Sequence, residues 1–125
     1  MKKVYGAFII LAVIISMAYA EYSVSQKTAD SIILYTEKVT DAIQNDESSV
    51  NRICDDMHQT WHEKQKILTL FLPQGDLLDI DILADDALIY AGTNDKQNLL
   101  VTLAEINNKM KSLRTSEEIS IYNLL

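Results

Sequence analysis

Hydrophobic residues run almost without a break near the start of the chain and then recur at helical spacing in the rest of it. The unbroken stretch extends from Val4 to Ala20 and contains no charged residue. After it, apolar residues return every three or four positions, which is the period of an amphipathic α-helix. The pattern therefore predicts an apolar segment over residues 1–20 and a helical domain over residues 21–125.

The apolar segment has the length and the flanking residues of a helix that crosses a membrane. Its seventeen uncharged residues would span about 26 Å, close to the hydrocarbon thickness of a bilayer. Tyr5 lies near one end, and Tyr19 and Tyr22 lie near the other, as in the aromatic belts of resident spans. The two lysines that precede the segment should stay in the cytoplasm. We therefore expect a single-pass protein of the cell membrane with residues 21–125 outside the cytoplasm.

The same segment also fits a signal peptide that is removed. Ala18-Tyr19-Ala20 has the small residues that signal peptidase recognises, and cleavage after Ala20 would release a chain that begins at Glu21. The alternative prediction is therefore a secreted protein. The length of the segment and its flanking tyrosines favour the anchor.

Periodicity predicts four helices in the remaining residues. Their expected bounds are residues 25–45, 49–72, 76–91 and 95–113. Nothing between Ala20 and Ser25 breaks a helix, so the apolar segment is expected to continue into the first of them. Pro73 should end the second helix, Asp76 should cap the third, and Gly92 should occupy the C′ position after it.

The scarcity of turn residues supports an all-α fold. The chain has three glycines and one proline, whereas β-sandwiches and phosphate-binding loops need more of them. Trp61 is in register with Met57 and Leu68 and is expected in the core. The predicted fold is an N-terminal transmembrane or signal helix followed by an extracytoplasmic up-and-down helical bundle of about four helices.

A short apolar tail follows the last predicted helix. It begins with Thr115-x-x-Glu118, which has the pattern of a capping box at a helix start. We expect this tail to pack back on the bundle.

One cluster of residues has metal-ligating side chains. Cys54, His58 and His62 are four residues apart and so share a helix face, where thiolate and imidazole groups suit zinc or copper. Gln59 follows His58 at the position where a metalloprotease helix has its glutamate, and no second His or Cys cluster completes a site. The three residues are the candidate metal ligands. The alternative is that Cys54 is a small core residue and both histidines lie on or near the surface.

Carboxylates are concentrated in the third predicted helix. Five aspartates lie between Asp76 and Asp86. Their spacing differs from that of an EF-hand loop, and no glycine occupies the turn position. We therefore expect the solvated face and N-terminus of an acidic helix.

The predicted domain is strongly acidic. Residues 21–125 carry nine basic and eighteen acidic side chains, a net charge of −9, which nucleic acid and anionic lipid surfaces would repel. Cys54 is alone, so no intramolecular disulfide forms. The sequence has no Gly-rich phosphate loop, nucleophile elbow or redox cysteine pair. We therefore expect no enzymatic activity, no cofactor and no nucleic-acid partner.

Short motifs along nearly the whole chain are shared with one protein family. They are the two-lysine start with its apolar segment, Lys27-Thr28-Ala29-Asp30, Trp61 before Lys64-x-Lys66 and Leu70-Phe71-Leu72, Asp76-Leu77-Leu78-Asp79-Ile80, and Ile119-Ser120-Ile121-Tyr122-Asn123-Leu124-Leu125. With these motifs the chain resembles a domain of unknown function, family four-three-six-three, of short proteins found mainly in spore-forming Firmicutes. The resemblance implies an anchored helical domain in a Firmicute-type cell envelope. It carries over no activity and no site residues.

Two functional hypotheses follow from the sequence. The first is a non-enzymatic, membrane-anchored interaction or structural protein of the bacterial cell envelope, which contacts another membrane or envelope protein. The second is an extracytoplasmic sensor or carrier that binds a metal or small ligand through Cys54, His58 and His62.

Overall fold

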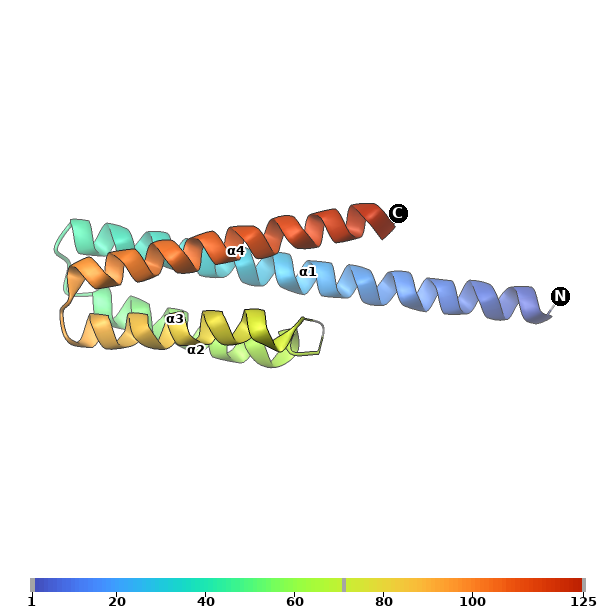
Figure 1. Cartoon of the computed structure of the whole chain (residues 1–125), viewed down its shortest axis with the longest axis horizontal. Helices are drawn as coiled ribbons and strands as arrows, with labels where there is room; N and C mark the ends of the chain where they lie inside the picture. Colours follow the sequence, from blue (N-terminus) through green and yellow to red (C-terminus); the bar gives the residue numbers. More distant parts are fainter. Residues whose placement is uncertain (1, 71, 125) are drawn as a thin grey trace.

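Four helices joined by short loops make up the described part of the chain (Figure 1). The computed structural model describes the backbone of residues 2–70 and 72–124, and the side chains of residues 3–70 and 72–115. The helices are α1 (Lys2–Gln44), α2 (Val50–Leu68), α3 (Gln74–Gly92) and α4 (Lys96–Leu124). The described residues form no strand, which confirms the predicted all-α class.

The helices form an up-and-down bundle. Each packs against its two neighbours in the order α1, α2, α3, α4 and back to α1, whereas the described residues make no close contact across either diagonal. Because the connections are short, successive helices run antiparallel. The apolar stripes of the four helices then pack around one core. The predicted bundle of about four helices is therefore confirmed.

Helix α1 is much longer than the bundle. It runs without a break for 43 residues, and its N-terminal part projects beyond α2, α3 and the end of α4 (Figure 1). No proline occurs in it, and no glycine follows Gly6, so nothing interrupts the helical hydrogen bonds. The predicted continuation of the apolar segment into the first bundle helix is confirmed.

The core is built from one apolar stripe on each helix. Its buried members are Ala29, Ile32, Ile33, Val39 and Ile43 of α1; Cys54, Met57, Trp61 and Leu68 of α2; Leu77, Ile80, Ala84, Ala87 and Ala91 of α3; and Leu99, Leu103, Ile106 and Met110 of α4. Trp61 lies among them, as its register with Met57 and Leu68 predicts.

The turn between α2 and α3 differs from the prediction. Helix α2 ends at Leu68, four residues before the predicted end, and Thr69 closes its last turn by donating its hydroxyl to the carbonyl of Lys66. Pro73 precedes α3 as its N-cap, with the extended ψ of 137° that leads the chain into a helix. Asp76 therefore lies in the first turn of α3 and does not cap it.

The ends of α1 and α3 use residues other than glycine in the left-handed conformation. Gly92 is the last helical residue of α3, and Asn94, with φ of 57°, occupies the C′ position predicted for Gly92. Asp46, with φ of 55°, plays the same part after α1. In both turns the two hydrogen bonds of a Schellman motif form, for example from the Asp95 amide to the Tyr90 carbonyl at 2.9 Å. Short polar side chains tolerate this conformation better than other residues.

Helix α4 continues where the sequence pattern predicts a break. The backbone is helical through Thr115 and Glu118 to Leu124, so the predicted capping box and separate tail are wrong. Neither Gly nor Pro occurs between Lys96 and Leu124, and a pattern that fits a helix start also fits a helix interior. The last turns of α4 extend along α1, past the turn between α2 and α3 (Figure 1).

Candidate functional site

Helix α3 carries apolar side chains on two opposite sides. Besides its buried face, it presents Leu78, Ile82 and Ile89 to solvent, with 57%, 51% and 61% of their surfaces exposed. With about 3.6 residues per turn, these positions fall on one line opposite the buried residues. We call these three residues the α3 outer face. Because a surface helix ordinarily keeps its apolar residues on one side, the α3 outer face is a candidate protein interface.

Carboxylates border the α3 outer face on both sides. Asp85 lies on the side of α2, where it contacts His58, and Asp79 lies on the side of α4, where its Oδ2 is 3.7 Å from Lys109 Nζ. Both aspartate side chains are mostly exposed. Helix α3 contains five aspartates and no Lys or Arg. The border is therefore negative, and a basic partner surface would complement it.

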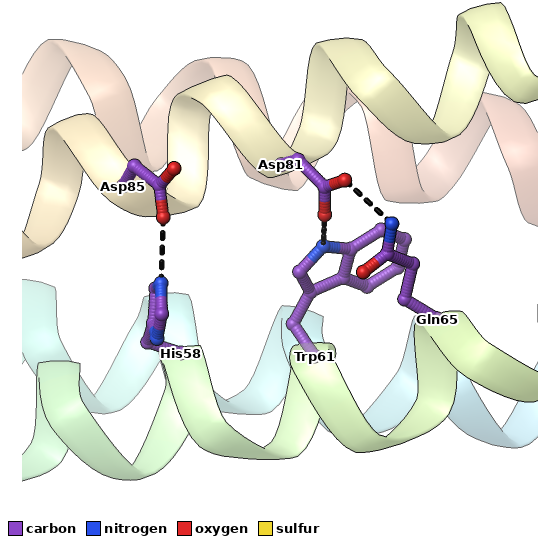
Figure 2. A network of polar contacts seen from close by, with 5 residues as sticks. All are labelled: His58, Trp61, Gln65, Asp81 and Asp85. Atoms are coloured by element: carbon purple, nitrogen blue, oxygen red, sulfur yellow. Dashed lines mark hydrogen bonds and ion pairs between the residues drawn. The ribbon is translucent and has the colours of Figure 1, made fainter.

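Side-chain hydrogen bonds between α2 and α3 fix the orientation of α3 in the bundle. Asp81 accepts a hydrogen bond from the indole Nε1 of Trp61 and another from the Nε2 of Gln65, both 2.5 Å long (Figure 2). One turn further along, His58 Nε2 lies 2.7 Å from Asp85 Oδ1. The hydrogen bond to Asp81 gives the buried indole N–H of Trp61 the partner that it requires. These contacts align the two helices and leave the α3 outer face pointing away from α2.

The five aspartates of α3 do not converge on one point. Asp81 and Asp85 contact α2, whereas Asp79 contacts α4. Asp76, Asp79 and Asp85 are exposed, as expected for an acidic helix face, whereas Asp81 and Asp86 are half-buried. Of these two, Asp81 accepts hydrogen bonds from Trp61 and Gln65. A calcium site would need several of these oxygens around one centre, and the described side chains do not offer it.

The three candidate metal ligands lie at different depths. Cys54 is buried in the core, His58 is half-buried against Asp85, and His62 is exposed. Each four-residue step turns a helix by about 40° beyond a full turn, so the set moves from the core to the solvent across two steps. Among the described residues, no three His, Cys, Asp or Glu side chains are placed to hold a metal ion together. The metal site therefore stays a prediction to which this geometry adds no support.

The chemistry of Cys54 follows from its place in the core. Burial raises the pKa of its thiol from 9.0 to about 11, because the apolar surroundings disfavour the charged thiolate. Metals and electrophiles react with the thiolate. Cys54 is therefore a packing residue with a poorly reactive thiol at neutral pH.

Comparison with known proteins identifies the family. The model of the domain of unknown function DUF4363 matches residues 19–124, which is most of the chain. The protein belongs to the DUF4363 family. The resemblance predicted from its motifs is thus confirmed. No curated protein and no solved structure matches the chain.

The α3 outer face of this DUF4363 protein has a sequence signal separate from the core stripe. Leu78, Ile82 and Ile89 have helical spacing of their own, between the residues that the stripe assigns to the core. A second stripe opposite the first is visible in the sequence. Which of the two faces inward depends on the neighbouring helices.

Proposed function

We propose that this DUF4363 protein is a non-enzymatic, single-pass membrane-anchored protein of the bacterial cell envelope. Its bundle lies outside the cytoplasm and binds another membrane or envelope protein through the α3 outer face. The observation that carries the proposal is helix α1, whose exposed apolar half continues without a break into the core of the bundle.

No part of the chain whose side chains the structure describes covers the apolar half of α1. Ten large hydrophobic residues between Val4 and Met17 are more than two-fifths exposed, and the window apolar enough to cross a membrane has no buried residue. Burial of one such side chain contributes about 1.5–3 kcal/mol. Exposing all of these side chains to water is therefore very unfavourable. The hydrocarbon core of a bilayer supplies the apolar surroundings that would bury them.

The local structure around Ala20 supports retention of the segment. Ala18 to Ala20 lie inside α1, and the same helix is packed in the bundle a short distance further on, where Ser25 and Thr28 are buried. Peptidases bind an extended chain, so cleavage here competes with a helix that the bundle stabilises. Secretion after cleavage behind Ala20 is the alternative outcome.

Charge supports the orientation and the type of partner. Two lysines precede the apolar half of α1, and such residues stay on the cytoplasmic side, which leaves the bundle outside. The α3 outer face combines three apolar side chains with a negative border. Apolar centres with polar rims are typical of protein interfaces, so the expected partner presents an apolar patch edged by Lys or Arg.

Site-specific photocrosslinking in cells tests the proposal. A photoreactive residue replaces Ile82 in the full-length chain, and the matched control carries it at Gln59, an exposed position on α2. We expect one reproducible crosslinked membrane or envelope protein from position 82 and not from position 59. Crosslinks to the same chain only, or none from position 82, would contradict the proposed interface.

A further inference from the structure

The two ends of the bundle differ in polarity. At one end, the turns after α1 and α3 contain Asp46, Glu47, Asn94 and Asp95. At the other end, Leu70 in the turn between α2 and α3 is 77% exposed, the largest value among the hydrophobic side chains that the structure describes. The apolar half of α1 leaves the bundle at this second end (Figure 1).

Hydrogen bonds between α1 and α4 fix the level that the end of α4 reaches. Asn107 Nδ2 donates to Thr36 Oγ1 at 2.9 Å, and Arg114 Nη1 donates to Asp30 Oδ1 at 2.9 Å. Because the two helices are antiparallel with equal rise, residues further along α4 face earlier residues of α1. Gln26 Nε2 also donates to the Arg114 carbonyl at 2.8 Å. Extrapolation from the three bonds places residues 119–124 of α4 level with about residues 18–23 of α1.

The level of Leu70 follows from the contact between α1 and α2. Thr60 Oγ1 lies 3.5 Å from Tyr35 Oη, so the two residues are at about the same height. Ten residues further along α2, Leu70 is level with about residue 25 of α1, some 7 Å beyond Ala20 at about 1.5 Å per residue. The headgroup region of a bilayer adds roughly 5–7 Å on each side of its hydrocarbon core. Leu70 therefore lies at the depth of the outer headgroups when the apolar half of α1 spans the core.

The sequence at the end of α4 suits the same depth. Residues 119–124 are Ile-Ser-Ile-Tyr-Asn-Leu, with no charge. Tyr122 falls at the level of Tyr19 and Tyr22 of α1, and tyrosine is enriched where membrane meets water. Three segments far apart in sequence thus bring apolar and aromatic residues to one plane.

We infer that the apolar end of the bundle, formed by Leu70 and residues 119–124 of α4, inserts into the outer interface of the membrane that α1 spans. The inference rests on the proposed anchor. The net charge of −9 on residues 21–125 keeps the sides of the bundle away from anionic lipid. The bundle therefore stands upright on the lipid surface, with its polar end furthest from the membrane.

Spin labels at both ends of the bundle test this inference. Leu70→Cys and Tyr122→Cys place a nitroxide at the apolar end, and Ser48→Cys is the control at the polar end. Cys54 is buried with a raised thiol pKa, so each introduced thiol reacts first. The full-length variants are reconstituted in vesicles of phosphatidylcholine and phosphatidylglycerol. The accessibility of each label to oxygen, which partitions into lipid, is compared with its accessibility to a water-soluble nickel chelate.

We expect the ratio of oxygen to nickel accessibility to be several-fold higher at positions 70 and 122 than at position 48. Flotation of the vesicles separates the two proposals. If the protein floats but positions 70 and 122 match position 48, the upright insertion is overturned and the anchor stands. If the protein does not float, the anchor fails and the insertion fails with it.

Discussion

Asp81 is the residue through which α2 and α3 make their most buried polar contact. It accepts hydrogen bonds from Trp61 and Gln65, and both donors belong to α2. We expect Asp81→Ala to lower the free energy of unfolding by about 1–3 kcal/mol, because the Trp61 N–H loses its partner in the core. Chemical unfolding of the full-length chain in detergent, followed by the fluorescence of its one tryptophan, measures the change.

Asp86→Ala is the matched control for this prediction. Asp86 lies on the same helix, and the described residues give it no hydrogen bond or ion pair. Its loss should leave the free energy of unfolding within about 0.5 kcal/mol of the wild type. Equal losses from both variants would assign the effect to the charge of α3 and not to the bond with Trp61.

At the scale of the element, α3 ends differently from the prediction, because Gly92 is a helical residue and does not occupy the C′ position. Gly92 has a helical backbone without positive φ, and a Cβ added there meets no atom within 4 Å. We expect Gly92→Ala to raise the free energy of unfolding by about 0.5–1 kcal/mol, because alanine loses less backbone entropy in a helix. Thermal unfolding monitored by circular dichroism measures the shift.

Asn94→Ala is the opposite test at the same helix end. With φ of 57°, Asn94 occupies the left-handed conformation, and alanine there should reduce stability by about 1 kcal/mol. If Gly92→Ala reduced stability and Asn94→Ala did not, the turn would begin at Gly92, as its sequence position suggests.

At the scale of the whole molecule, the proposed anchor predicts where the chain is found in cells. Fractionation of expressing cells should recover the full-length chain with the membrane, and its intact mass should include residues 1–20. Protease added to the outside of intact cells should remove the bundle, because the proposed orientation keeps the positive end of α1 in the cytoplasm. A mass that begins at Glu21 in the medium would show secretion and would contradict the anchor.

Many structural features of this protein could be predicted from its sequence alone. The apolar segment, the helical content, the core stripes and the place of Trp61 all follow from hydrophobic periodicity, because local spacing decides which residues of a helix share a face. The same local rules were insufficient at helix ends. Asn94 rather than Gly92 took the left-handed position, and α4 continued through Thr115, since capping patterns also fit helix interiors.

Only the tertiary structure decided how the faces pair and align. The bond of Asp81 with Trp61, the different depths of Cys54 and His62, and the outward direction of Ile82 depend on how helices are rotated and shifted against one another. The common level of Leu70 and the end of α4 depends on the same alignment. These properties arise from packing between segments far apart in sequence, and hydrophobic spacing within one segment carries no information about them.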